Sequence, residues 1–368
     1  MIQAVPISNR KARILVVGDS FCPSAALRAA FEELAEEHHV TFGDVHPEPD
    51  WKPSTPSELR LREAEGSPEQ LIAMIDHHDV LVMQGANVTD AVLDASPELR
   101  LVACARGGPV NVDVAAASDR GIAVVITPGK NADAVAELTV GFMIMLGRRL
   151  PEVIRHVEGG GEFAHDNYEG RHWFGHDLAG HTLGLIGFGQ VGSRVVARAL
   201  PFGMRVVVSD PFVDPAMISA VGAEPVDLDE LLAVSDYVSL HARQSAENKG
   251  MIGAVQLAAM KRGAFLINTA RDTLLDEAAV VAALASGQLA GLAVDLVSPS
   301  PDSGRHPLLA FPNVIITTHI GGATFETLHH GGEMAAAEIR RYLAGQPMLN
   351  VVNRAALKQR APELVPMK

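Results

Sequence analysis

Cysteine is scarce in this chain, and basic residues are outnumbered by acidic ones. Only Cys22 and Cys104 occur among 368 residues, which excludes a scaffold held by several disulfides and favours a reducing compartment, with both thiols buried. Lysine and arginine number 30 against 44 aspartates and glutamates, for a formal net charge of −14. A nucleic-acid partner is therefore not expected, because binding a polyphosphate needs clustered positive charge.

No stretch is both long enough and apolar enough to cross a membrane. The longest strongly apolar run, Leu138–Leu146, is far shorter than the ~20 residues that a spanning helix needs. The N-terminus has an early basic cluster but lacks the layout of a signal peptide. We expect a soluble, cytoplasmic protein without a membrane partner.

Apolar runs that alternate with helical segments predict an α/β protein, and the length suffices for two domains, each with its own core. Strands are expected at 13–17, 80–83, 101–105, 122–126, 183–186, 206–208, 237–240, 265–268, 292–296 and 314–317. Helices are expected at 24–38, from 68, at 90–94, 112–118 and 132–155, from 190, and at 324–343. Such alternation indicates parallel strands joined by crossover helices, and the last helix is expected to return to the first part of the chain.

Two helix starts carry capping residues. Ser24 is the expected N-cap of the helix over 24–38, and Ser67 that of the helix beginning at Pro68. Gln70 stands three residues after Ser67, where it can complete a reciprocal capping box.

The segment from Thr182 to Asp210 predicts a strand, a glycine turn, a helix and a second strand. It contains the pattern GxGxxG as Gly187, Gly189 and Gly192, in the setting that binding of a dinucleotide requires. Gly187 is expected to make the tight turn, Gly189 to let the backbone approach a pyrophosphate, and Gly192 to let the helix pack closely on the sheet. The helix N-terminus offers free N–H groups to that anion.

Asp210 ends the second strand of this segment, 18 residues beyond Gly192. A carboxylate at this place can accept hydrogen bonds from the adenosine ribose of a dinucleotide. No lysine or arginine occurs from Pro211 through Leu240, so this segment has no positive side chain that could bind a 2′-phosphate. NAD is favoured over NADP.

Polar residues that directly follow the apolar runs are candidates for ligand binding, because ligands of open parallel sheets bind beyond the carboxyl ends of the strands. Four stand out: His241, Arg271, Asp295 and His319. A hydride transfer between a nicotinamide and an alcohol also moves a proton, for which histidine is the natural acid/base. An arginine can hold a substrate carboxylate with two hydrogen bonds, although Arg271 could instead pair with Asp272 or Asp276.

The chain resembles the D-2-hydroxyacid dehydrogenases related to phosphoglycerate dehydrogenase, glyoxylate and hydroxypyruvate reductase, and formate dehydrogenase. The likeness covers nearly the whole chain and rests on several segments in the family's order. These are TPGKNADAVAELTVGFMI, LAGHTLGLIGFGQVG, SDYVSLH, MKRGAFLINTARDTLLDEAAVVAALASGQLAGLAVDL, NVIITTHIGGAT and NVVN. Together they are far more specific than the glycine motif alone.

The resemblance implies two Rossmann-like or flavodoxin-like domains with parallel sheets, the NAD domain being inserted into the substrate domain. Residues 1–127 and 325–368 would form the substrate domain, and residues 128–324 the NAD-binding domain. The expected partner is a small 2-hydroxy or 2-keto acid. A homodimer joined through the NAD domain is also implied, with the segment from Gly159 to Trp173 reaching toward the partner.

The same resemblance assigns roles to single residues. Arg271 would hold the substrate carboxylate and carbonyl, His319 would be the acid/base, and Asp295 would contact the nicotinamide amide. The Gly107–Gly108 turn would offer N–H groups to the carboxylate, with Arg106 as a possible second cation. The complete predicted cofactor-binding set is Gly187, Gly189, Gln190, Val191, Gly192, Asp210, His241, Thr269, Ala270, Asp295 and Gly321.

The chain departs from the family at Ser300, where most members place a glutamate that pairs with the histidine. Three hypotheses compete. Ser300 orients His319, whose pKa then lies nearer the unperturbed value of about 6.5; or Asp302 replaces the glutamate through a shifted loop; or the chemistry needs little proton transfer, as in formate dehydrogenase. We favour the first two.

Other departures concern the substrate side. Asp272 stands where the family usually has glycine, and it could point to solvent, bind a substrate hydroxyl or restrain Arg271. Arg243 and Gln244 replace a usual Pro-Leu, which alters the adenine-side lip rather than the chemistry. The loop after Arg106 also lacks the usual acidic residue before Asn111.

The sequence predicts an NAD-dependent enzyme that interconverts a D-2-hydroxy acid and its 2-keto acid. The alternative is an NAD-sensing, corepressor-like or scaffold protein, because fold alone does not establish activity. No metal site is indicated, since the histidine pairs 38–39, 77–78 and 329–330 lack the spacing of ligands.

Overall fold

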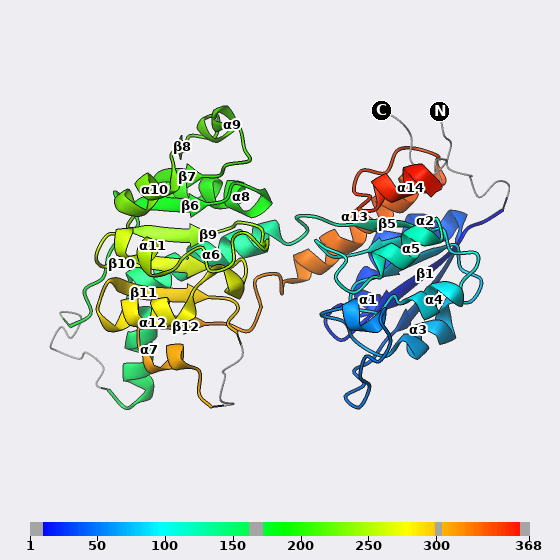
Figure 1. Cartoon of the computed structure of the whole chain (residues 1–368), viewed down its shortest axis with the longest axis horizontal. Coiled ribbons are helices and arrows are strands. Elements are labelled where there is room, and N and C mark those ends of the chain that lie inside the picture. Colours follow the sequence, from blue (N-terminus) through cyan, green and yellow to red (C-terminus); the bar gives the residue numbers. More distant parts are fainter. Residues whose placement is uncertain (1–9, 162–171, 299–303, 361–368) are drawn as a thin grey trace. The chain divides into compact units, whose positions relative to one another are not determined.

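The computed structural model describes residues 10–161, 172–298 and 304–360, and it divides the chain into two compact units. The first unit is Met1–Lys130 with Thr324–Lys368, and the second is Asn131–Ala323. The chain therefore passes from one unit to the other twice (Figure 1). The helix α13 (Phe325–Leu343), orange in Figure 1, returns to the first unit, as the sequence predicts.

The first unit is built on a five-stranded sheet in the order β2-β1-β3-β4-β5, with every strand pairing parallel. Its strands are β1 (Arg13–Gly18), β2 (His39–Asp44), β3 (Val80–Met83), β4 (Leu101–Cys104) and β5 (Ala123–Ile126). This is the flavodoxin-like strand order. Because side chains alternate along a strand, Ile14 and Val16 enter one core cluster, and Leu15 and Val17 enter the other.

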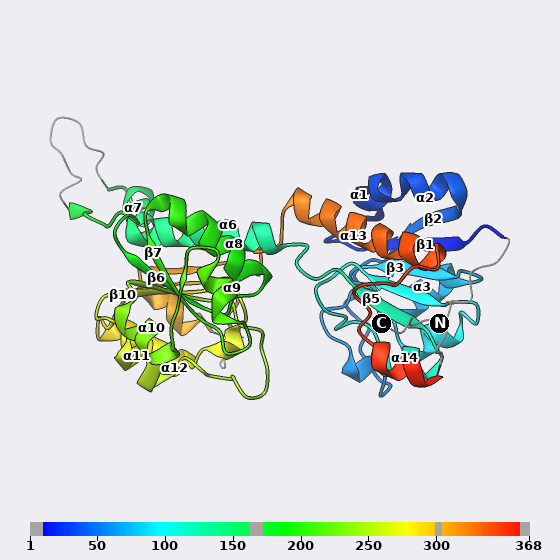
Figure 2. The same cartoon turned by 90° about the horizontal axis from the view of Figure 1, so that it is seen from above.

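Helices cover both faces of this sheet. One face carries α1 (Ser24–Leu27) and α13, which lie side by side (Figure 2), and the other is packed against α3 (Pro68–Ile75), α4 (Asp90–Asp94) and α5 (Val114–Asp119). The remaining helices of the unit are α2 (Glu32–Glu37) and α14 (Arg354–Arg360).

Of the two capping assignments in this unit, Ser24 is wrong as an N-cap, and Ser67 is confirmed as an N-cap but without the predicted capping box. The helix predicted over 24–38 is interrupted by a 3-10 turn at Arg28–Phe31, and its N-cap is Pro23. Ser24 instead donates its hydroxyl to Asp44 at 2.8 Å. Ser67 is the N-cap of α3 but makes no capping hydrogen bond with its side chain, and Gln70 bonds His46 and Glu48 rather than closing a box.

The second unit holds a seven-stranded parallel sheet in the order β12-β11-β10-β9-β6-β7-β8. The order around β6, with β7 and β8 on one side and β9, β10 and β11 on the other, is that of the Rossmann fold. Its strands are β6 (Thr182–Ile186), β7 (Arg205–Ser209), β8 (Glu224–Pro225), β9 (Tyr237–Leu240), β10 (Ala264–Asn268), β11 (Leu289–Val294) and β12 (Val314–Ile316). The predicted strand at 292–296 starts three residues and ends two residues later than β11 does.

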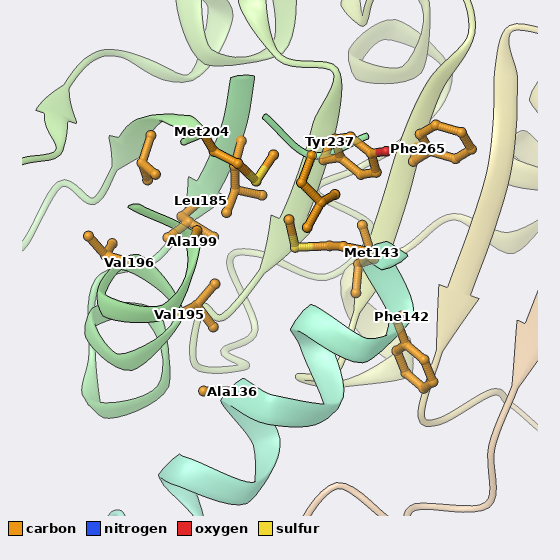
Figure 3. Close-up of a cluster of buried hydrophobic side chains, with 14 of the residues drawn as sticks. Ala136, Phe142, Met143, Leu185, Val195, Val196, Ala199, Met204, Tyr237 and Phe265 are labelled. Atoms are coloured by element: carbon orange, nitrogen blue, oxygen red, sulfur yellow. The ribbon is translucent and has the colours of Figure 1, made fainter. Parts of the chain in front are cut away.

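Two helical layers sandwich this sheet. On one face α6 (Ala132–Gly147) and α8 (Gln190–Ala199) pack against Leu185, Tyr237 and Phe265, as Figure 3 shows. On the other face lie α10 (Leu228–Val234), α11 (Ala254–Ala259) and α12 (Glu277–Ala285), while α9 (Pro215–Ser219) lies beside β8. Burial of these apolar faces fixes the strand ends, and the strand ends position the site.

The helix predicted over 132–155 is two helices. α6 ends at Gly147, and α7 (Leu150–Glu158) begins after Arg149, which adopts the left-handed conformation with φ 56°. Gly147 at the end of α6 and Pro151 in the first turn of α7 both mark this break, so the sequence carried a signal that the prediction of a single helix overlooked. The described part of the chain contains no helix that is long and apolar enough to span a membrane.

Candidate functional site

The three glycines after β6 each have a distinct environment. Gly187 has φ +100°, and a Cβ there would lie 2.8 Å from the backbone N of Ala242. A Cβ on Gly192 would lie 2.3 Å from the carbonyl oxygen of Gly187, so the helix packs closely on the turn. Nothing lies within 4 Å of the Cβ position of Gly189. The fold therefore requires glycine at 187 and 192, whereas at 189 it leaves open space.

That open space lies at the N-terminus of α8. Gly189 is its N-cap, no side chain caps the helix, and Gln190 and Val191 form its first turn. Gln190 turns its side chain to Arg194 rather than to the helix end. Free N–H groups and the positive end of the helix dipole make this a place for an anion such as a pyrophosphate.

Asp210 directly follows β7 and faces the glycine turn. One of its carboxylate oxygens accepts a hydrogen bond from the N–H of Phe188 at 2.7 Å, and the other accepts one from Phe212 at 2.9 Å. Each oxygen keeps a lone pair for another donor. The residue predicted to bind a ribose is thus fixed in place by the turn that carries Gly187 and Gly189, and it can still accept hydrogen bonds.

The loop after β10 brings Thr269, Ala270 and Arg271 to the carboxyl edge of the sheet. The hydroxyls of Thr269 and Thr139 lie 3.0 Å apart, and Asn268 accepts a hydrogen bond from the N–H of Ala270 while donating one to the carbonyl oxygen of Arg271. The buried Asn268 side chain therefore locks the backbone on both sides of Arg271.

The Arg271 guanidinium is exposed and, in the part of the chain that the structure describes, makes no ion pair. Its Nη1 donates to the carbonyl oxygen of Ala270 at 2.7 Å. Asp276 caps α12, and Asp272 accepts a hydrogen bond from the Ser298 hydroxyl at 2.9 Å. Neither acid forms an ion pair with Arg271, so the N–H donors of its guanidinium are available to a carboxylate.

His319 belongs to a short loop that the buried Asp295 holds. Asp295 follows β11, and its carboxylate accepts hydrogen bonds from Thr317 Oγ1 at 2.6 Å, Ile320 N at 2.9 Å and Gly321 N at 2.7 Å. The backbone oxygen of Asp295 also accepts from the N–H of His319 at 2.7 Å. This grip fixes His319 in the left-handed region, with φ +61° and an exposed side chain.

These hydrogen bonds give Asp295 a structural role that the sequence did not predict. Three of its acceptor positions are used by the His319 loop, and the oxygen that faces Gly321 retains one lone pair. Gly321 itself is pressed against that oxygen, since a Cβ there would lie 2.7 Å from it. Asp295 thus positions the histidine loop whatever else it contacts.

His241 follows β9, and its Nε2 lies 3.0 Å from the Ser239 hydroxyl. Burial lowers the pKa of His241 to about 4. The ring is therefore neutral near neutral pH, which suits a residue beside a dinucleotide but not a proton donor.

In the first unit, the loop after β4 carries Arg106, Gly107 and Gly108. No atom lies within 4 Å of the Cβ position of either glycine, so both are open to a ligand. Arg106 forms an ion pair with Glu63 and also donates to the Glu63 carbonyl oxygen at 2.7 Å. Its charge is already matched, which weakens its predicted role as a second cation.

Sequence reasoning overlooked a polar pair at the same edge of this sheet. The Lys130 amine donates to Gln84 Oε1 at 2.7 Å, and Gln84 directly follows β3. Gln84 could have been found by inspecting the end of every strand. Lys130 could not, because its partner lies 46 residues earlier in the chain. Ser300 and Asp302 lie outside the described residues, as does most of the segment expected to reach toward a partner.

No group of three or more side chains that could hold a metal ion occurs within residues 10–161, 172–298 and 304–360. The polar groups that the structure places together suit a dinucleotide and a small carboxylic acid.

Comparison with known proteins agrees with this geometry. The sequence profile of the D-isomer specific 2-hydroxyacid dehydrogenase, NAD binding domain, matches residues 140–321. The glyoxylate reductase of Korarchaeum cryptofilum is 36% identical over 302 residues, which cover 82% of this chain and 90% of that protein. The D-3-phosphoglycerate dehydrogenase of Methanocaldococcus jannaschii is 35% identical over 293 residues, or 79% of this chain and 55% of that protein.

Solved structures show the same relationship. A glyoxylate reductase from Paecilomyes thermophila superposes with a TM-score of 0.70 at 28% identity, covering 93% of this chain and 98% of that one. The chain spans about half the length of the phosphoglycerate dehydrogenases that it matches, 55% and 54% for two archaeal examples. By its sequence, its NAD-binding unit and its fold, the chain belongs to the family of D-isomer-specific 2-hydroxyacid dehydrogenases.

Proposed function

We propose that this chain is an NAD-dependent enzyme that interconverts a D-2-hydroxy acid and its 2-keto acid. The proposal rests on Arg271, which makes no ion pair with the described residues, and on the rigidly held His319; both lie at the carboxyl edge of the sheet that also bears the glycine turn. Relatives named glyoxylate reductase and D-3-phosphoglycerate dehydrogenase support it. NAD supplies the acceptor or donor of the hydride.

Arg271 is proposed to hold the substrate carboxylate. Its exposed guanidinium lacks an acidic partner in the described chain, and its backbone is locked by Asn268. A planar fork of donors binds a carboxylate with two parallel hydrogen bonds and so fixes the carbon that reacts.

His319 is proposed to take the hydroxyl proton in oxidation and to return it in reduction. A histidine suits this role because its ordinary pKa lies close to neutral pH. The left-handed backbone at 319 is costly for a residue with a Cβ, and the Asp295 hydrogen bonds hold it. Such strain is commonly found where a side chain must be aimed.

The cofactor and substrate assignments complete the proposal. Gly189, Gln190, Val191 and Asp210 would bind the dinucleotide beside β6 and β7, with His241, Thr269, Ala270, Asp295 and Gly321 along the same edge. In the first unit, the Gly107–Gly108 turn would give N–H groups to the substrate carboxylate. Ser300 would orient His319 in place of the family's usual glutamate.

The test is NADH oxidation with a panel of 2-keto acids, measured from acidic to mildly alkaline pH. His319→Ala should lower kcat about 10²–10⁴-fold while NADH still binds, since a positioned acid/base contributes that much. His39→Ala, on the exposed edge strand β2, is the matched control and should behave like the native protein. Tight NADH binding without turnover of any 2-keto acid would instead favour an NAD-sensing protein.

Ser300→Glu adds a charge where the family has one. If Ser300 is the partner of His319, the glutamate should raise the pKa that governs turnover. An unchanged pH profile would rule out that part of the proposal.

A homodimer is proposed on a separate observation. α7 has no buried residue, and Leu150, Ile154 and the nearby Phe174 are 38%, 47% and 75% exposed. Apolar side chains gathered on a surface commonly mark a protein interface. The molar mass in solution, by light scattering, tests this.

A reducing, cytoplasmic location is also proposed, because Cys22 and Cys104 are buried free thiols.

A further inference from the structure

An acidic residue directly follows the arginine that is proposed to bind the substrate. Asp272 stands next to Arg271 in the chain, at a position where glycine is usual in the family. A carboxylate so close to a guanidinium can pair with it and then competes with a substrate carboxylate for the same N–H donors. In the described part of the chain these two side chains form no ion pair with each other. Another contact therefore holds the acid.

That contact is Ser298, in the segment that follows β11. Its hydroxyl donates to Asp272 Oδ2 at 2.9 Å, and both side chains are half-buried. A hydrogen bond to a carboxylate is charge-assisted and stronger than one between neutral groups. An ion pair with the exposed Arg271 guanidinium would be screened by water and contribute little. The Asp272 carboxylate is therefore more stable at Ser298 than at Arg271.

Glu277, in the first turn of α12, holds the backbone of Ser298. Its Oε1 accepts a hydrogen bond from the Ser298 N–H at 3.1 Å. Its Oε2 lies 3.6 Å from Nε2 of His306, whose side chain is only 10% exposed. Ser298 is thus fixed through its main chain, independently of its hydroxyl. Removal of the hydroxyl should release Asp272 without releasing the segment.

The backbone on the Asp272 side is also fixed. Asn268 donates to the carbonyl oxygen of Arg271 at 2.7 Å. The next residues form the 3-10 turn Asp272–Leu274, in which the carbonyl oxygen of Thr273 accepts from the N–H of Gly250 at 2.8 Å. The main chain therefore stays in place, and only the Asp272 side chain is free to exchange one partner for the other.

We propose that Ser298 keeps the Asp272 carboxylate away from Arg271 and so leaves the arginine free for the substrate. Ser298 and Asp272 are positioning residues, whereas Arg271 is the group that contacts the substrate. Without the Ser298 hydroxyl, Asp272 acts as an internal competitor of the substrate carboxylate. This inference rests on the proposed function and adds the pair of residues that sets the affinity for 2-keto acids.

The first variant to measure is Ser298→Ala, in NADH oxidation with a 2-keto acid. Because the substrate must then displace Asp272 from Arg271, KM should rise about two- to sixfold, the effect of a competing exposed ion pair, while kcat stays unchanged. Ser298→Thr keeps the hydroxyl and should behave like the native protein. Ser286→Ala is the matched control, because it removes a serine hydroxyl from the end of α12 that donates to the Ala283 carbonyl oxygen at 3.1 Å.

The decisive variant combines Ser298→Ala with Asp272→Asn. Asparagine keeps the size of aspartate but has no charge to offer Arg271, so the second substitution should return KM to its native value. Asp272→Asn alone should leave KM unchanged, because Ser298 already holds the native carboxylate. If Ser298 only supported the fold of its segment, Asp272→Asn would not restore KM, and kcat would fall as well.

Two results overturn the inference: a Ser298→Ala protein with the native KM, or a raised KM that Asp272→Asn does not restore. If Ser298→Ala does not fold, Ser298→Cys takes its place, because a thiol is only a weak donor. Denaturant unfolding of each variant shows whether it is folded.

Calorimetry of oxamate binding to the NADH complex separates this inference from the proposed function. Oxamate is a stable analogue of a 2-keto acid, and its Kd should change across the variants as KM does. If oxamate binding follows this order although no 2-keto acid is turned over, the proposed function is refuted and the role of Ser298 is kept. A protein that neither turns over a 2-keto acid nor binds oxamate refutes both.

Discussion

Replacing Asp295 by asparagine should both destabilise the second unit and slow the reaction. The carboxylate is 2% exposed and accepts three hydrogen bonds from the loop that carries His319. Asparagine keeps the shape but turns one oxygen into an NH2 group. Whichever way the amide lies, a donor then faces Gly321 N–H on one side or Thr317 and Ile320 on the other.

The magnitude follows from these contacts. At least one hydrogen bond to a charged acceptor is lost, and a buried N–H is left without a partner, so Asp295→Asn should cost about 2–4 kcal/mol of unfolding free energy. The left-handed backbone at His319 loses its support, and a displacement of about 1 Å at a reacting group can cost 10²-fold in rate. We therefore expect kcat to fall about 100-fold.

Denaturant unfolding and steady-state kinetics measure the two effects. Asp227→Asn is the control, because Asp227 caps α10 through the N–H of Glu230 at 2.8 Å and asparagine caps a helix equally well. That variant should stay within about 0.5 kcal/mol of the native protein. An Asp295→Asn protein as stable and as fast as the control would refute the idea that the carboxylate holds the loop.

Two further predictions concern the dinucleotide side of the second unit. Gly187→Ala should lower the free energy of unfolding by about 2–4 kcal/mol, because the φ of Gly187 is +100° and the new methyl group would lie 2.8 Å from Ala242 N. Gly189→Ala should fold normally, because the space around Gly189 is open, but a fluorescence titration should show NADH binding weakened about tenfold. His241 should make stability fall with acid: its pKa is about 4 when folded and about 6.5 when unfolded, so the unfolded chain binds more protons between these values and roughly 3 kcal/mol is lost as pH falls across them. His241→Gln should flatten that part of the pH–stability curve, and an unchanged curve would contradict the assignment.

The approximate ends of the strands could be predicted from the sequence, and with them the positions of the polar residues that follow, whose roles stay predictions. Short runs of buried branched residues end where polar residues begin, so the amino-acid pattern alone places Arg271, Asp295 and His319 after β10, β11 and β12. The glycine turn could also be predicted from the sequence, because each of its positions has a separate steric requirement. Both are local features of the chain.

Features that depend on distant residues could not be predicted. The hydrogen bonds between Asp295 and the His319 loop join positions more than twenty residues apart. Lys130 likewise lies beside Gln84, which precedes it in the chain, and Gly331, which comes far later. β2 was missed because His39–Asp44 is only partly buried and carries polar residues at both ends. The break between α6 and α7, by contrast, could have been predicted from Gly147 and Pro151, although the left-handed conformation of Arg149 could not.

The double passage of the chain between its units also has a consequence for synthesis on the ribosome. Asn131–Ala323 is continuous and can fold as soon as it emerges, whereas the first unit must wait for α13, which supplies Ala335, Ala336, Ile339 and Tyr342 to its core. At about 5–20 residues per second, that wait lasts on the order of ten to forty seconds. During this interval one face of the first sheet has α1 but lacks α13, so a nascent chain stalled before Thr324 should be the form that chaperones capture.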